Sequence, residues 1–560
     1  GAAGMMHANG FALPPGRFQS VAASCIMAIA IAATNGCAGR PEPAAEAGRT
    51  AGVDGASQMA PAMPQAVRDT LLDGAMAVLG RLEGYDEASA FSQVFDRLNQ
   101  WSHGVAMGSP AAAGAWHLDP LVESLPAELR PLASAESLGS SVFDGADDVR
   151  ALRDQRWLAD IAATARGDAI DDVDVARNLF DWTVRSLAIG SDPPMVPTAA
   201  NPGSRWFLPG EVLLSGRASP AQRAWIFLEL LRHAGLDGVM LATGDAAKGT
   251  LRPWIPAVVS GGEAYLFDPA YGMPIPGPGG DGIATARQAA ADPSILRGMS
   301  VADRAYPLQA ADVASLTVLV PATNVNLARR MHLLDEHLAG KRKIDLVIEA
   351  GDLGARALAA LPGEPGAGRV RLWEFPWETL RRRSSPPAVA AARAELAPMA
   401  LQLEESGWGE DSARRVVRPL YAGRVREFRG DLDGPEGAKV AYLMARPSNQ
   451  QIAEALKRLP PEQADAARRL YESMKQDATY WLGVLTLAEG EYETAIDYLG
   501  RMTLEAAPDG PWTDAARLNL ARAKAALGQT AAAVELLRAD PSPQRFGSRL
   551  LSDRIEKKSR

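Results

Sequence analysis

Cysteine and histidine are scarce in this chain of 560 residues. The two cysteines, Cys25 and Cys37, both lie near the N-terminus, which excludes a disulfide framework and a cysteine-based zinc site. The six histidines are scattered along the chain. The sequence contains no H-E-x-x-H metal motif, no G-x-x-x-x-G-K-[ST] phosphate loop and no G-x-S-x-G nucleophile motif. We therefore predict no metal and no cofactor.

Basic residues are also fewer than acidic residues. The chain has 58 Lys and Arg against 67 Asp and Glu, a formal net charge of −9. Because nucleic-acid-binding proteins need a basic face, we predict no nucleic-acid partner. Hydrophobic residues make up 47% of the chain, enough to bury real cores, and its length predicts two or three domains.

An uncharged apolar run near the N-terminus, Val21 to Ala33, is too short to span a bilayer comfortably but has the size of a signal-peptide core. The following Gly36, Cys37 and Ala38 resemble a bacterial lipoprotein cleavage site, in which Cys37 would be lipidated. The pattern predicts a signal peptide over 1–37, a disordered linker over 38–63, and an exported protein anchored by lipid at the periplasmic face of the cell envelope. A signal peptide cut elsewhere, or a fortuitous apolar stretch, is the alternative.

Helical spacing of apolar residues follows this linker. It predicts two amphipathic helices between Pro64 and Gly104, within a helical N-terminal region 64–146. Two more helices are predicted near 147–166 and 173–188, and Asp171 or Asp172 can cap the second.

The most informative unit covers 219–269. Ser219 to His233 reads as a strongly apolar helix that opens with Ser-Pro-Ala-Gln, a predicted capping box. Strands are predicted at 238–242, 255–259 and 264–267, with a turn at Gly261-Gly262 and an end at Asp268-Pro269. A buried helix followed by a small antiparallel sheet indicates an α+β arrangement.

This order of elements resembles the transglutaminase-like superfamily, whose fold is related to papain. The resemblance covers roughly 147–290 and implies a domain over 147–300. The residues that fit the family spacing are Ala224, Phe227, Leu230-Leu231-Arg232, Ala234-Gly235-Leu236, Val258-Val259, Gly262, Tyr265-Leu266-Phe267 and Asp268-Pro269. The resemblance places the family's nucleophile position at Pro220 and its histidine position at Pro253, so only Asp268 of the triad remains.

The missing residues decide what chemistry the resemblance implies. A thiol enzyme places its cysteine at a helix N-terminus, where the dipole lowers the thiol pKa, and needs a histidine beside it. No cysteine follows Cys37, so the prediction is a degenerate domain without catalytic residues. Ser219 is the alternative nucleophile, but it needs a base, and His233 lies at the far end of the same helix. A capping role for Ser219 and a turn role for Asp268 are the commoner readings.

The C-terminal segment 446–560 has a helical pattern with an internal repeat. Aligning Gly490 with Gly528 pairs small residues and leucines across the two copies: Leu482 with Leu520, Gly483 with Ala521, Ala495 with Ala533 and Leu499 with Leu537. This resembles a tetratricopeptide repeat, which implies a concave surface that binds a peptide or protein. We predict Trp481, Tyr492 and Trp512 as partner-binding residues. A generic bundle of helical hairpins is the alternative.

Residues 301–445 form a middle α/β region whose fold the sequence does not indicate. Strand patterns occur at Ile344–Ile348 and Val370–Trp373.

The prediction as a whole is an α+β protein: a papain/transglutaminase-like core, a helical N-terminal region and an all-α, tetratricopeptide-like C-terminus. The predicted function is non-catalytic binding or scaffolding by a lipoprotein at the bacterial envelope, with the transglutaminase-like cleft as a peptide groove. The alternative is a hydrolase or acyl transferase whose relocated, non-cysteine active site uses Ser219 or Asp268.

Overall fold

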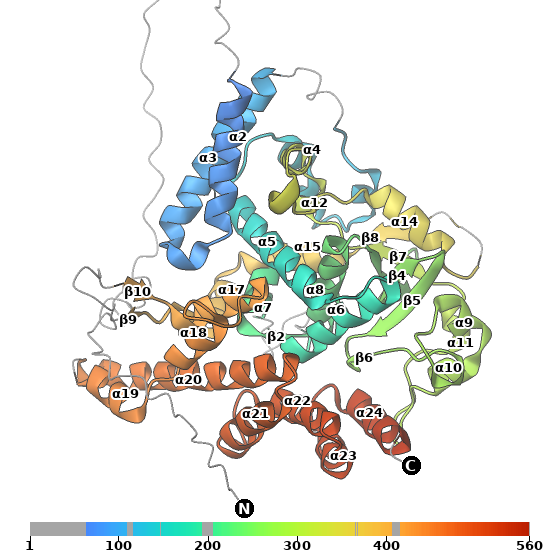
Figure 1. The fold of residues 1–560 in the computed structure, drawn as a ribbon. Helices are drawn as coiled ribbons and strands as arrows, with labels where there is room; N and C mark the ends of the chain where they lie inside the picture. The colour runs from blue at the N-terminus through green and yellow to red at the C-terminus, as the bar shows by residue number, and fades with distance from the viewer. Residues whose placement is uncertain are drawn as a thin grey trace, which may run out of the picture.

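The computed structural model describes residues 63–108, 116–145, 147–192, 205–363, 366, 368–405, 415–457 and 459–558. The predicted signal peptide, Cys37 and all but the last residue of the linker lie outside the described residues. Figure 1 shows a central sheet with helices on both faces, and a layer of C-terminal helices along one side. The chain is a mixed α and β protein, as predicted at this coarse level.

The sheet has six strands in the order β6-β5-β4-β3-β7-β8. All neighbours are antiparallel except β7 and β8. The three predicted strands are present as β3, β4 and β5, and both Gly261 and Gly262 of the predicted turn have positive φ. The strands are β3 Asp237–Thr243, β4 Arg252–Ser260, β5 Glu263–Asp268, β6 Met273–Pro274, β7 Thr317–Val320 and β8 Val370–Leu372.

The middle region supplies two strands of this sheet, β7 and β8, so the sheet runs across the predicted boundary at residue 300. β8 confirms the strand pattern near Val370. The predicted strand at Ile344–Ile348 is wrong, because this segment is not held by a strand ladder. Instead Asn326 Nδ2 donates to Leu346 O (2.8 Å), and Ile344, Leu346 and Ile348 are buried in the core.

Alternating residues of the sheet enter two separate cores. On β3, Met240 and Ala242 pack into the core that contains α8, Pro220–His233, whereas Val239 and Leu241 pack into the core on the other face. The first core also takes side chains from α5, Asp147–Ala165, and α6, Asp172–Ser186. The second takes side chains from α2, Gln65–Leu79, and α3, Glu87–Gly108.

The predicted helices of the N-terminal half are all present, and Asp171 caps α6 by accepting hydrogen bonds from the Val173 and Asp174 N–H groups. Short elements complete the α/β part. They are α4 Ala135–Gly139, β1 Ala188–Ile189, α7 Pro209–Ser215, β2 Arg217–Ala218, α9 Ala286–Ala291, α10 Pro293–Arg297, α11 Ala310–Val313, α12 Asn324–Leu327, α13 Arg329–Asp335, α14 Ala350–Ala359, α15 Glu374–Arg383, α16 Pro386–Glu395, β9 Leu403–Glu405, β10 Arg415–Val417, α17 Pro419–Arg429 and α18 Ala438–Met444.

The C-terminal segment is helical, and its two predicted copies are two helical hairpins. Gly490 and Gly528 stand at the equivalent turns with φ of 79° and 74°, a conformation that favours glycine. The helices are α19 Asn449–Leu456, α20 Pro461–Ala488, α21 Tyr492–Ile496 with its continuation Asp497–Glu505, α22 Thr513–Ala526, α23 Thr530–Arg538 and α24 Arg545–Lys558. Within the described ranges, no helix combines the length and the apolar character that crossing a membrane requires.

Candidate functional site

The start of α8 carries the predicted capping box. Ser219 Oγ accepts a hydrogen bond from the Gln222 N–H (3.2 Å), and Gln222 Oε1 accepts one from the Ser219 N–H (3.0 Å). Asp192 Oδ1 accepts from the Ala221 N–H (3.0 Å), and Pro220 has no N–H. The amides that would stabilise a thiolate in a cysteine enzyme are therefore engaged by the protein's own side chains.

The positions of the expected triad lie at one end of the layer formed by α8 and the sheet. Arg223, one turn into α8, donates to Pro269 O (3.1 Å), so the start of the helix lies beside the end of β5. Pro253, near the start of β4, is exposed and pairs with Ala242 of β3. All three positions therefore lie at the same end of this layer, but the Asp268 side chain does not face α8.

Asp268 points to the opposite face of the sheet. Along β5, Phe267 packs into the core that contains α8, whereas Leu266 packs into the core on the other face. Asp268 follows Leu266 in this alternation, and it accepts hydrogen bonds from the Tyr271 N–H (2.9 Å) and the Tyr306 hydroxyl (2.7 Å). Burial raises the pKa of the Asp268 carboxyl. The side chain therefore stabilises the turn after β5, the role predicted for it.

Ser219 has no base in contact within the described ranges. Its side chain is 3% exposed and is engaged by the amide of Gln222. His233 lies at the other end of α8, where Nε2 is 2.8 Å from Gln155 Oε1, and burial lowers its pKa well below the usual value.

The C-terminal helices close over the start of α8 (Figure 1). Gln544 Oε1 accepts a hydrogen bond from Arg223 Nη1 (2.6 Å), and Asn519 Nδ2 donates to Arg185 O (3.0 Å). Gly547 approaches the turn between β5 and β6 so closely that an added Cβ would lie 1.8 Å from a backbone oxygen. Backbone contact of this kind fixes the helical layer against the sheet.

A cavity of about 340 Å³ remains between the start of α8 and the C-terminal helices. Its wall contains Arg223, which is 1% exposed and donates to three main-chain carbonyls and to Gln544. None of these hydrogen bonds goes to a carboxylate, and burial, with the nearby charge of Arg522, lowers the pKa of Arg223 to about 9. Asn519 Oδ1, also buried in this wall, has no hydrogen-bond partner in the described part of the chain.

A second cavity of about 530 Å³ shares Val184, Leu518 and Gln544 with the first. We call the two together the interdomain cleft. The second cavity combines apolar side chains of α23 and α24 with Tyr492, and it contains Arg554, whose pKa is lowered by burial.

Arginine exceeds acid in the interdomain cleft. The two walls contain seven arginines and four aspartates (three of each in the first cavity, four and one in the second). They are Arg205, Arg217, Arg223, Asp192, Asp514 and Asp540, then Arg177, Arg185, Arg522, Arg554 and Asp181.

Two of the three predicted partner-binding residues are core residues in this structure. Trp481 and Trp512 are 0% and 2% exposed, and Tyr480 stacks on Trp512 with ring centroids 4.2 Å apart. Gly216, with φ of 64°, packs against Trp481 where an added Cβ would lie 2.1 Å away. These tryptophans join the helical layer to the α/β core and are not available to a partner. Tyr492 is half-buried and lines the interdomain cleft.

The cleft residues that sequence reasoning missed are Arg223, Asn519 and Gln544. Arg223 had a local signal, because it is a charged residue directly before the buried apolar run Ala-Trp-Ile-Phe-Leu, residues 224–228. Asn519 and Gln544 had none, since they reach the cleft from elements about three hundred residues away in sequence.

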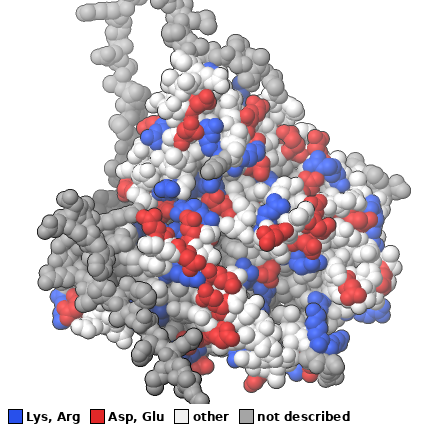
Figure 2. Space-filling model, in the orientation of Figure 1, with Lys and Arg blue, Asp and Glu red and all other residues white. Residues whose placement is uncertain are grey.

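Comparison of the chain with protein-family models, curated proteins and solved structures gives no significant match. On the face shown in Figure 2, basic and acidic side chains are interspersed, so no broad basic surface covers that face.

Proposed function

We propose that this protein binds a peptide and does not catalyse a reaction. In this proposal a degenerate transglutaminase-like domain and tetratricopeptide-like helices together form the interdomain cleft, which receives the C-terminal end of an apolar peptide. The observation that carries the proposal is the closure of the helical layer over the start of α8, where Ser219 and Asp192 engage the amides and Arg223 lies buried without a carboxylate.

The composition of the cleft supports this ligand class. Its apolar side chains suit leucine-like residues. Most of its arginines are already paired with carboxylates, among them Arg205 and Arg217 with Glu395, so the arginine that suits a free carboxylate is Arg554. Arg554 forms no ion pair within the described part of the chain, so it is available to a carboxylate in the second cavity. Peptide recognition is also what concave helical repeats commonly do.

The location in the proposal rests on sequence alone. Export through the apolar run Val21 to Ala33 and lipidation of Cys37 would place the cleft at the periplasmic face of the bacterial envelope, as a binding or scaffold lipoprotein.

A fluorescein-labelled pentapeptide of leucine and alanine with a free C-terminal carboxylate tests the proposal by fluorescence anisotropy. We expect saturable binding, and about tenfold weaker binding of the same peptide as its C-terminal amide, because a charge-assisted hydrogen bond is lost. Arg554→Gln and Tyr492→Ala should each weaken binding of the acid peptide. Lys557→Gln is the matched control, since Lys557 is an exposed cation of the same helix that does not line the cleft.

The proposal fails if acid and amide peptides bind alike, or if Lys557→Gln weakens binding as much as Arg554→Gln does. Mass spectrometry of the incubated peptide addresses the alternative of a relocated active site. Cleavage that disappears in Ser219→Ala or Asp268→Asn would favour that enzyme over a binding protein.

Point variants are better tests than truncation of the helical repeats. Deletion of 470–560 would remove Trp481 and other side chains from the core that contains α8. Loss of binding would then report unfolding rather than loss of the site.

A further inference from the structure

A short strand in the wall of the interdomain cleft has one unpaired edge. β1 forms a two-stranded parallel sheet with β2, which is its only strand partner in the described ranges. The five residues from Ala188 to Asp192 all line the first cavity, so a continuous stretch of main chain belongs to its wall. At Gly190 an added Cβ would meet no atom within 4 Å, so open space lies over this main chain.

The hydrogen bonds of β1 determine which of its backbone groups are unpaired. The Ala188 N–H donates to Gly216 O and the Gly190 N–H donates to Ala218 O, each at 2.8 Å. Alternate residues of a strand direct their N–H and C=O groups to opposite edges, so those of Ile189 point away from β2. Neither group of Ile189 has a hydrogen-bond partner in the part of the chain that the structure describes.

The unpaired edge of β1 faces the C-terminal helical layer. Leu187, two residues before Ile189, has an extended backbone, so its C=O points to the same edge, where it accepts from Arg223 Nε (3.0 Å). Arg223 also donates to Gln544 of the helical layer (2.6 Å), and both side chains line the first cavity. α22 contacts β1 as well. The N–H and C=O of Ile189 therefore lie on the side of β1 that borders the cleft.

The Ile189 side chain adds an apolar contact at the same place. Ala188 packs against the core that contains α8, whereas Ile189 is half-buried and belongs to neither core. Because neighbouring side chains of a strand point to opposite faces, the Ile189 side chain points away from this core. A ligand residue paired with Ile189 would place its own side chain beside it, which favours an apolar residue there.

We propose that an extended peptide adds a strand to β1 and pairs with the backbone of Ile189. This inference rests on the proposed function, since the peptide is the ligand of the interdomain cleft, and it adds how that peptide is held. An unpaired N–H and C=O on one residue are complementary to the main chain of another extended segment, as in other cases of β-strand addition. At this point the cleft recognises the backbone of its ligand, and only in an extended conformation.

The direction of the peptide follows from the order of the two cavities along the chain. Val184 lines both cavities, Ile189 lines only the first, and Arg554 lines only the second. The chain thus enters β1 from the side of the second cavity, and a peptide with its carboxylate at Arg554 runs antiparallel to β1. In an antiparallel pair one peptide residue exchanges both hydrogen bonds with Ile189, and its two neighbours direct their N–H groups away from β1.

Methylation of single amide nitrogens in the peptide tests this pairing. The test uses the full chain and the fluorescein-labelled pentapeptide of leucine and alanine, with one N-methyl group at each of residues two to five in turn. By anisotropy we expect one position to weaken binding by about tenfold, because the methyl group removes a donor and blocks the approach to β1. The positions next to it should bind within about twofold of the parent peptide, since their amides face away from β1. An ester in place of the sensitive amide should weaken binding by about fivefold, which separates the lost hydrogen bond from the bulk of the methyl group.

Two variants of Ile189 test the same contact from the side of the protein. Ile189→Pro removes the outward N–H and keeps the bonds of Ala188 and Gly190 to β2, and edge strands tolerate proline at such positions. It should weaken binding of the pentapeptide by about fivefold to tenfold. Ile189→Val is the matched control, because valine keeps the N–H and a branched apolar side chain, and it should bind like the parent chain. The methylation series needs no variant, so it tests the pairing even where Ile189→Pro lowers stability.

The proposal is overturned if all four methylated peptides bind alike, or if a folded Ile189→Pro chain binds as tightly as Ile189→Val. The comparison of acid and amide peptides reports separately on the proposed function. If acid and amide bind alike but one methylated position remains sensitive, pairing with β1 stands and carboxylate recognition is wrong. If the acid is preferred but no position is sensitive, carboxylate recognition stands and the pairing is wrong. Absence of any peptide binding overturns both.

Discussion

Asp477 is a carboxyl group buried in the aromatic joint between α20 and α22. It is 8% exposed, and its Oδ1 accepts a hydrogen bond from Trp512 Nε1–H (2.7 Å). Burial raises its pKa to about 6, although the charge of Arg217 opposes this rise. Burial in a core favours the neutral acid over the carboxylate, so the stability of this joint depends on whether Asp477 is protonated.

This coupling predicts a pH dependence of stability. The folded chain holds the Asp477 proton up to about pH 6, whereas the unfolded chain releases it near pH 4, so the folded state binds more protons between these values. The free energy of unfolding should therefore fall by about 2 kcal/mol as pH rises from about 4 to about 6. Denaturant titration of the parent chain and Asp477→Asn should show the variant more stable at about pH 7 and nearly equal at about pH 4. An equal difference at both pH values would contradict the assignment.

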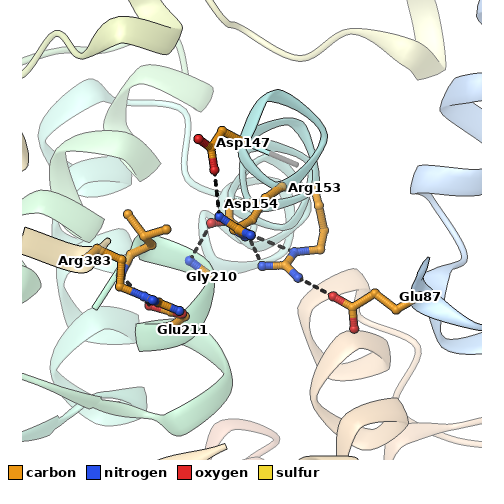
Figure 3. Close-up of polar contacts among 9 residues, drawn as sticks. Glu87, Asp147, Arg153, Asp154, Gly210, Glu211 and Arg383 are labelled. Atoms are coloured by element: carbon orange, nitrogen blue, oxygen red, sulfur yellow. Dashed lines mark hydrogen bonds and ion pairs between the residues drawn. The ribbon is translucent and has the colours of Figure 1, made fainter. Parts of the chain in front are cut away.

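A second residue-scale prediction concerns Gly210. In Gly210→Ala the new methyl group would collide at 2.1 Å with the Asp154 carboxylate, which pairs with Arg153, and expel it from its hydrogen bonds (Figure 3). We expect a loss of stability of about 2–4 kcal/mol, as for a disrupted buried charge pair. Gly351→Ala is the control, because Gly351 of α14 has no atom within 4 Å of its added Cβ and alanine favours helix. Thermal denaturation should rank the two variants on opposite sides of the parent chain.

At the scale of the element, α8 shows how a helix start is completed by its own first residues. Pro220 sets the first turn, and the capping box with Gln222 satisfies amides that would otherwise be free. The helix buries two charged side chains, Arg223 and Glu229. Arg223 is surrounded by carbonyls of Val184 and Leu187 at the end of α6 and by the carbonyl of Pro269 after β5. The first residues of α8 thus cap the start of the helix and also supply Arg223 to the wall of the cleft.

Ser219→Ala tests this description of α8. Removal of the cap should lower the free energy of unfolding by about 1–2 kcal/mol, because the Gln222 amide loses its acceptor in a buried setting. Ser219→Asn should recover most of the loss, since asparagine also caps helices well. Chemical denaturation measures both, and a Ser219→Ala chain of unchanged stability would refute the capping role.

At the scale of the whole molecule, one continuous core joins the α/β part to the C-terminal helices. It includes Trp157 of α5, Phe227 of α8 and Trp481 of α20. Arg424 lies over the ring of Trp481, at 3.6 Å from its centroid. Because no boundary interrupts this core, we expect the helical layer to unfold together with the sheet.

Trp481→Ala provides the test of this cooperativity. Loss of a fully buried tryptophan should cost about 3–5 kcal/mol and lower the melting temperature of the entire chain. Calorimetry should show one transition for both proteins. A second, earlier transition in the variant alone would mean that the C-terminal helices form an independent unit.

Much of the local structure could be predicted from sequence patterns. The cap at Asp171, the capping box at Ser219 and the turn at Gly261 and Gly262 rest on interactions within a few residues, and all three are present. The prediction of a strand at Ile344–Ile348 was wrong because no neighbouring strand pairs with this segment. Its side chains pack into the core, and Asn326 donates a hydrogen bond to its backbone. The likeness to transglutaminase-like proteins and to tetratricopeptide repeats stays a prediction.

The sequence by itself determined the local elements, since capping depends on neighbouring residues, and it places no cysteine after Cys37. Only the tertiary structure decided which residues lie in the core and which line a cavity. Trp481 and Trp512 became core residues because the helical layer docks on Gly216 and its surroundings. Arg223 meets Gln544, and Asp154 meets Gly210, through contacts between segments distant in the chain. Such contacts depend on how whole elements pack, and the pattern of any single element does not encode them.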